Sequence, residues 1–160
     1  MLIMRPTPAT QQDFASRLKN VRAVARPQPD LVQEVQRAIL LGFGQNFDSE
    51  SDGGFRWARL AASTIQDRLR QGYGPGPILQ RSRDYRASWT NPDAPDHVSE
   101  VTEWAGGWSQ AEGSQHPLVG FHQAGTRRIP ARPVNDLDLS AQEQLRQAVD
   151  TWIFQTLFVR

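Results

Sequence analysis

The spacing of apolar residues in this 160-residue chain follows a helical period near both ends and loses it over residues 89–129. Within that middle segment, apolar side chains fall between Gly-Gly and Gly-Ser turns, as they do in short antiparallel strands, and a hairpin turn is expected at Gly106-Gly107. The change of period predicts an α+β fold, in which helices pack on a small antiparallel β-sheet and a long C-terminal helix follows the sheet.

Capping residues and apolar stripes predict the positions of the helices. Ser140 and Glu143 form a capping box at the start of the last helix. Pro77 suits the first turn of the helix predicted over residues 77–89. An exposed loop is expected over 47–54 and a stiff linker over 72–77, because both are rich in turn-forming residues. The predicted helices cover residues 10–25, 31–46, 64–71, 77–89 and 141–158.

The length of the chain fits one domain over residues 1–160, and its content excludes several classes of protein. No cysteine is present, so disulfides, thiolate nucleophiles and zinc-thiolate sites are excluded. No apolar run approaches the roughly 18 residues of a membrane span, and the N-terminus does not resemble a secretory signal. We therefore expect a soluble protein that is intracellular when made and has no membrane partner.

Charge is strongly polarised in the middle of a chain whose net charge is only +1. Arg68, Arg70, Arg81, Arg83 and Arg86 precede a stretch without Lys or Arg that holds Asp93, Asp96, Glu100, Glu103 and Glu112. This split has two open interpretations: the two stretches form differently solvated faces of one subunit, or they form complementary contacts between copies of the chain.

Motifs for catalysis are mostly missing. The chain has no Gly-x-Ser-x-Gly elbow, and the six-residue spacing of His116 and His122 matches neither a helical turn nor one face of a strand. A small metal-dependent hydrolase or nuclease that uses these histidines with acidic partners stays an alternative. A second alternative is a packaging accessory that contacts DNA through the arginines of residues 68–86.

Several sequence blocks, in order, resemble the phage virion-morphogenesis family, the small tail-completion proteins of tailed phages and Mu-like prophages. The late pair of blocks is the most specific, with Gln123 and Pro130 seven residues apart. The match covers about residues 47–155 and covers the N-terminal helices over 1–46 less well. The blocks are Phe47, Asp52-Gly53, Trp57-Ala58-Arg59-Leu60, Thr64-Ile65-Gln66-Asp67-Arg68, Ile78-Leu79, Ser82–Ser88, Phe121-His122-Gln123-Ala124-Gly125 and Ile129-Pro130-Ala131-Arg132-Pro133.

The resemblance implies a structural protein that completes the tail or neck at the head–tail junction and has no catalytic activity, cofactor or metal. It implies a ring of identical subunits, such as a hexamer, with other tail, neck or connector proteins as partners. DNA would pass through the assembly without sequence-specific binding, and the protein would be found in the virion and, during assembly, in the host cytoplasm.

Candidate subunit-interface residues come from the charge split, the late motif blocks and the last helix. Arg132 lies between two prolines, and its planar guanidinium suits either a bidentate contact with another subunit or a salt bridge to its own acidic segment. Phe154 and Phe158 lie off the apolar stripe of the last helix. The full set is Arg68, Arg81, Arg83, Arg86, Glu100, Glu103, His122, Gln123, Arg132, Phe154 and Phe158.

Overall fold

The computed structural model of this protein describes residues 16, 19, 25–105 and 107–156. Within these residues the chain forms five helices and one two-stranded antiparallel sheet, so the predicted α+β class is confirmed. The helix expected over 10–25 falls almost wholly outside the described residues. The elements are α2 (Pro29–Ser49), α3 (Ala62–Arg70), α4 (Asp84–Thr90), β1 (His97–Trp104), β2 (Gly107–Ser114), α5 (Val119–Ala124) and α6 (Leu139–Phe154).

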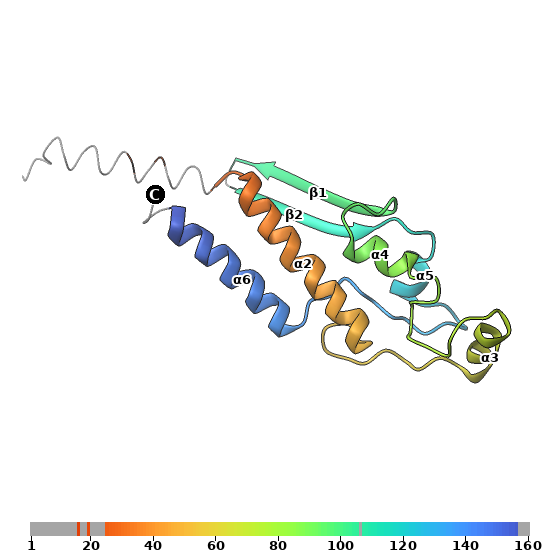
Figure 1. The fold of residues 1–160 in the computed structure, drawn as a ribbon. Helices are drawn as coiled ribbons and strands as arrows, with labels where there is room; N and C mark the ends of the chain where they lie inside the picture. The colour runs from red at the N-terminus through yellow and green to blue at the C-terminus, as the bar shows by residue number, and fades with distance from the viewer. Residues whose placement is uncertain (1–15, 17–18, 20–24, 106, 157–160) are drawn as a thin grey trace, which may run out of the picture.

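Helix α2 is the longest element and lies at the centre of the molecule (Figure 1). It begins with Pro29 in its first turn and ends where Glu50 adopts a left-handed backbone with φ 53°. It ends three residues later than predicted, so the expectation that an exposed loop begins at Phe47 was wrong. Phe47 is fully buried against Trp57 and Tyr85, and this packing extends the helix into a segment whose composition favours a turn.

Helix α6 packs alongside α2 and confirms the predicted long C-terminal helix. Its cap differs from the prediction: the side chain of Asp138, rather than Ser140, accepts a hydrogen bond from the backbone N–H of Ala141 at 2.7 Å. The helix therefore starts two residues earlier than expected. The indole N–H of Trp152 donates to Asp30 at 2.8 Å and ties the far end of α6 to the start of α2.

The hairpin β1–β2 lies on the other side of α2 from α6 (Figure 1). His97 pairs with Ser114 and Trp104 with Gly107, so the hairpin is confirmed, but its connection lies between Trp104 and Gly107, one residue earlier than predicted. The sheet ends at Ser114. The expectation of strands as far as residue 129 was wrong, because α5 occupies residues 119–124.

Helix α4 is much shorter than the helix predicted over 77–89. Leu79 has φ 59° and Arg83 has φ 68°, and left-handed residues cannot continue a right-handed helix. Burial of Ile78 and Leu79 in the core holds this irregular segment in place. The helix begins only at Asp84, directly after the second left-handed residue.

An aromatic core joins the helices at one end of the molecule. Phe43 meets Trp89 edge-to-face at 5.2 Å between ring centroids, and Phe47 meets Trp57 at 5.8 Å in the same way. A smaller cluster holds α2 to α6 at the other end, and Ile39 packs against both clusters. No described helix is both long and apolar enough to cross a bilayer.

Candidate functional site

Three motif blocks that are far apart in the sequence meet at the end of the molecule beyond the aromatic core. The indole N–H of Trp57 donates to the Pro133 carbonyl at 2.9 Å, and the backbone N–H of Arg132 donates to the His122 carbonyl at 2.6 Å. Gly125, with φ 70°, allows the last two blocks to approach, because a Cβ there would lie 2.6 Å from the backbone nitrogen of Ala131. These blocks therefore build one structural unit.

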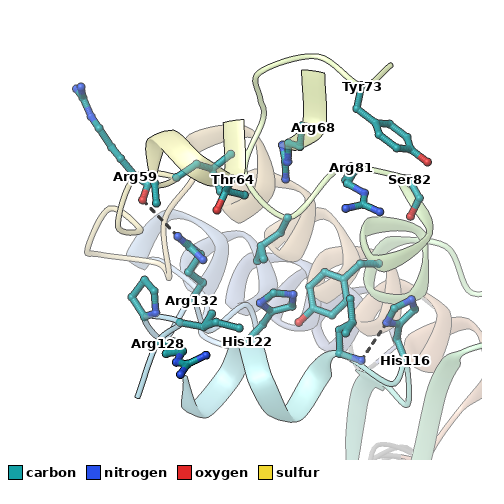
Figure 2. A pocket seen from close by; sticks show the side chains of 17 residues that line it. Arg59, Thr64, Arg68, Tyr73, Arg81, Ser82, His116, His122, Arg128 and Arg132 are labelled. Carbon is teal, nitrogen blue, oxygen red and sulfur yellow. Dashed lines mark hydrogen bonds between the residues drawn. The ribbon is translucent and has the colours of Figure 1, made fainter. Parts of the chain in front are cut away.

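A cavity of about 500 Å³ opens within this unit, between α3, α5 and the segments that join them. Figure 2 shows Arg68 reaching from α3 and His122 from α5 toward this cavity, with Arg81 and Tyr73 along one side and Arg132 along the other. We call it the arginine pocket, because five arginines line it: Arg59, Arg68, Arg81, Arg128 and Arg132. Among the described residues, no Asp or Glu contributes to its lining.

Two of these arginines are buried. Arg68 and Arg132 are each 6% exposed, and their described hydrogen bonds go to backbone carbonyls. Arg68 donates to Pro77 at 2.8 Å, and Arg132 donates to Ala58 at 3.1 and 2.9 Å. Arg132 thus joins two segments of its own subunit through backbone oxygens, and it forms no salt bridge among the described residues.

The positive charges in the pocket act on one another. Burial and the charge of Arg81 lower the pKa of Arg68, and burial and the charge of Arg68 lower the pKa of Arg132. Glu50 opposes both shifts, yet it forms no ion pair within 4.0 Å among the described residues, and its carboxylate accepts from the backbone of Ile78 instead. Glu50 therefore offsets part of the charge of these two guanidiniums from a distance, without a direct ion pair to either.

Polar atoms without partners line the same cavity. The Tyr85 hydroxyl and the His122 Nδ1 are buried and have no hydrogen-bond partner among the described residues. Burial raises the pKa of Tyr85 to about 12, and the indole nitrogen of nearby Trp89 opposes this shift without reaching hydrogen-bond geometry. The pKa of His122 is lowered by burial, by Arg132 and by His116, which favours the neutral imidazole.

The predicted basic surface is not a single open face. Arg68 is buried, Arg70 and Arg81 lie 3.5 and 4.0 Å from Asp67, and Arg86 lies 2.7 Å from Asp48. Arg81 and Arg83 precede α4, so the expectation that the arginines lie on two helices was wrong for these two. Only Arg83 of the group is exposed with no ion pair among the described residues.

The predicted acidic surface is divided as well. Glu100 and Glu103 are exposed on β1, but residues three apart in a strand lie on opposite faces, so the two do not form one patch. Glu112 is not a surface residue. Its carboxylate is buried against His97 at 2.8 Å and also accepts from Ser99 and Gln110.

The remaining candidates come from α5 and the last helix. Gln123 is half-buried in α5, and its amide nitrogen has no partner among the described residues. Phe154 is more than half exposed, as its place off the apolar stripe predicts. Phe158 lies outside the described residues.

The histidines of the hydrolase alternative do come together. His116 and His122 both line the arginine pocket and pack edge-to-face on Tyr85, at 5.4 and 5.0 Å. Across the part of the chain that the structure describes, no group of three or more His, Asp or Glu side chains could hold a metal ion.

Sequence reasoning missed two features of this region. It did not single out His97, whose Nδ1 lies 3.1 Å from the Ser88 carbonyl and whose Nε2 contacts Glu112. It also treated Tyr85 only as an aromatic beside arginines. No local pattern identifies either residue, because their partners lie on other elements.

No protein-family model matches the chain, and neither a curated protein nor a solved structure matches it.

Proposed function

We propose that this chain is a structural phage protein of the virion-morphogenesis kind, which completes the tail or neck at the head–tail junction as a ring of identical subunits. It acts through protein contacts, without catalysis and without sequence-specific DNA binding. The resemblance of residues 47–155 supports the class, and the meeting of its blocks in one structural unit is consistent with it.

The observation that carries the assembly role is the exposure of strand β1. Every residue of β1 except His97 is exposed. In the described part of the chain the sheet has two strands, so one edge of β1 pairs with β2 and no described strand lies beside the other edge. Such an edge is a template for pairing with another chain unless charge or a covering segment blocks it. The strand thus offers a surface for a neighbouring subunit.

The outer face of β1 has the composition of a contact surface. Val98, Glu100, Thr102 and Trp104 share this face, and Trp104 is 57% exposed. The opposite face carries His97 and Ser99, which bond to Glu112 beneath α2. Exposed apolar side chains beside an open strand edge mark an interaction site rather than a solvated surface.

A second copy of the chain suits this face by charge. Glu100 gives the face a negative charge, whereas exposed arginines such as Arg83, Arg127 and Arg59 lie on other parts of the subunit. A ring requires two different, complementary patches, because its contacts are heterologous. Surface ion pairs contribute only about 0.2–1 kcal/mol each, so the apolar residues and the strand edge would supply most of the affinity.

Native mass spectrometry of the full chain tests this proposal. The wild type should form one closed oligomer at micromolar concentration, visible in electron micrographs as rings. The double variant Val98→Lys/Trp104→Lys should be a folded monomer, because it places charge on the contact face. The matched control Phe55→Lys/Leu139→Lys changes two other exposed apolar residues, 80% and 82% exposed, and should still assemble.

Two results would contradict the proposal. A wild-type chain that remains monomeric at about 100 μM would remove the assembly role, as would equal loss of assembly in both double variants, since the contact would then not depend on β1. For the phage role itself, particles produced without this chain should accumulate as separate heads and tails, and normally joined particles would refute that role.

A further inference from the structure

We propose that the arginine pocket is a binding site for a small phosphate-bearing ligand of about nucleotide size. This inference is independent of the proposed ring, because no residue of β1 or β2 lines the cavity.

The charge balance of the pocket favours a bound anion, because Glu50 offsets only part of the charge of Arg68 and Arg132 and pairs directly with neither of them. Arg68 and Arg132 are buried, act on each other electrostatically and bond to neutral carbonyls. A buried charge is costly unless it is paired, and no described carboxylate lines the cavity to pair with these guanidiniums. A bound anion would supply the missing negative charge.

The number of cationic groups favours phosphate over a single carboxylate. Five arginines line the cavity, and three of them, Arg68, Arg81 and Arg132, approach it from different segments (Figure 2). Planar guanidiniums bind phosphate oxygens through two parallel hydrogen bonds, and a phosphate or diphosphate carries two or more negative charges. A single carboxylate would leave most of the positive charge unbalanced.

Unpartnered buried groups provide a second, independent observation. Tyr85 lines the cavity and is only 4% exposed, and its buried hydroxyl has no hydrogen-bond partner among the described residues. The His122 Nδ1 is also buried and has no hydrogen-bond partner among the described residues. An unsatisfied buried polar atom is destabilising, so its retention at a cavity wall indicates a partner that arrives with a ligand.

The size and walls of the cavity define the rest of the ligand. About 500 Å³ exceeds the volume of an inorganic phosphate, and Leu60, Leu79, Leu118 and Ile129 supply apolar walls beside the cationic groups. Tyr73, at the side of the cavity, presents an aromatic ring that Arg81 already covers at 5.0 Å. An organic group the size of a nucleoside would fill this space, with its phosphate against the arginines.

The depth of the cavity argues against a nucleic-acid backbone and a folded partner. The innermost arginines are each 6% exposed, so a polymer that stays on the surface would reach the rim but not Arg68 or Arg132. A compact ligand can enter completely.

Isothermal titration calorimetry on the full chain, at a constant 0.15 M chloride, tests the proposal with pyrophosphate and adenosine 5′-monophosphate as probes. At least one probe should bind one site per subunit, and uncharged adenosine should bind at least about tenfold more weakly than its monophosphate. Arg81→Gln, whose side chain is 47% exposed, and the isosteric Tyr85→Phe should fold normally and lower the affinity, by about tenfold or more for the arginine.

The matched control is Arg37→Gln, which removes an exposed arginine that pairs with Glu34 on α2, outside the pocket lining. It should leave binding unchanged within about twofold, since it alters only the surface charge. Absence of binding by both probes at 1 mM, or an equal loss in Arg37→Gln and Arg81→Gln, would overturn the proposal. The proposal would also be overturned if a peptide of residues 90–104 bound in the pocket in place of the probes, because the pocket would then be a protein contact. Since binding and assembly are measured separately, failure of either proposal leaves the other standing.

Discussion

The arginine pocket and strand β1 place opposite charges in opposite kinds of surroundings. In the pocket, arginines from three separate segments converge on a concave site, and two of them are buried on backbone carbonyls. On β1, the carboxylates of Glu100 and Glu103 are exposed and point to opposite faces of a two-stranded sheet. The two charged stretches look alike in the sequence, but Arg68 and Arg81 of the first line a cavity, whereas Glu100 and Glu103 of the second are exposed on a strand.

This difference shows that surroundings, more than charge count, decide what a charged segment does. The left-handed backbone at Leu79 and Arg83 turns the chain so that Arg81 and Tyr85 both line the cavity. The regular alternation of a strand instead separates neighbouring carboxylates. The charges on β1 are therefore open to solvent, whereas the charges of Arg68 and Arg132 are buried beside a cavity.

The largest predicted change in the free energy of unfolding compares the packing of the core beside the arginine pocket with the packing of strand β1. Phe47→Ala, in the core beside the pocket, should lower the free energy of unfolding by about 3–5 kcal/mol, because it leaves a cavity among Trp57, Tyr85 and the rest of α2. Val101→Ala, at a 40% exposed position of β1, should lower it by about 1 kcal/mol or less. Urea denaturation of both variants gives the comparison, and equal losses would mean that β1 is packed as tightly as the core.

The second-largest predicted change in the free energy of unfolding concerns Glu112, whose buried carboxylate holds the hairpin to the helices. Glu112→Ala should cost about 3 kcal/mol, because His97, Ser99 and Gln110 lose their shared acceptor. Hydrogen exchange should then speed up across β1 and β2 while α2 keeps its protection. A uniform increase across all helices would show that the hairpin does not open as a separate unit.

In the arginine pocket we expect a smaller change in stability, and it should be an increase rather than a loss. Tyr85→Phe should raise the free energy of unfolding by about 1 kcal/mol, because it removes a buried hydroxyl without a partner and preserves the ring contacts with Phe47 and Trp89. Thermal unfolding measures the change. A loss of stability would indicate that the hydroxyl has a partner in solution, which would weaken the case for a ligand there.

The smallest predicted effect is the contribution of His122 to the pH dependence of the free energy of unfolding. The pKa of His122 is lowered from 6.5 in the folded protein, so the unfolded chain takes up a proton more readily. Stability is therefore fully present above pH 6.5 and should fall as the pH drops through and below that value. His122→Phe should reduce this loss between pH 7 and pH 5 by a fraction of a kcal/mol. An identical pH profile in the variant would show that His122 is not responsible.

The sequence predicts the helix pair well and the pocket poorly, for physical reasons. Helices α2 and α6 present apolar stripes whose period is local, so α2 was found with errors of two and three residues at its ends, and the start of α6 with an error of two. The hairpin was found from its glycines. The errors lie where distant contacts override local preference, as at Phe47 and in the segment before α4.

The candidate site was recovered only in part. His122 and Arg132 were selected from their motif blocks and do meet in the structure, and Arg68 and Arg81 join them at the same cavity. No spacing in the sequence could show that these arginines converge, because they come from α3, the segment before α4 and the segment after α5. The burial of Tyr85 and the pairing of His97 with Glu112 likewise depend on contacts between elements.

The most direct test of the assembly role is hydrogen exchange on strand β1, measured for the same chain as a dilute monomer and as the assembled ring. A neighbouring subunit on the open edge should slow deuterium uptake over His97–Trp104 by about tenfold or more, while α6 changes little. The contradicting result would be a ring in which β1 exchanges as fast as it does in the monomer, because the subunits would then be held together by another surface.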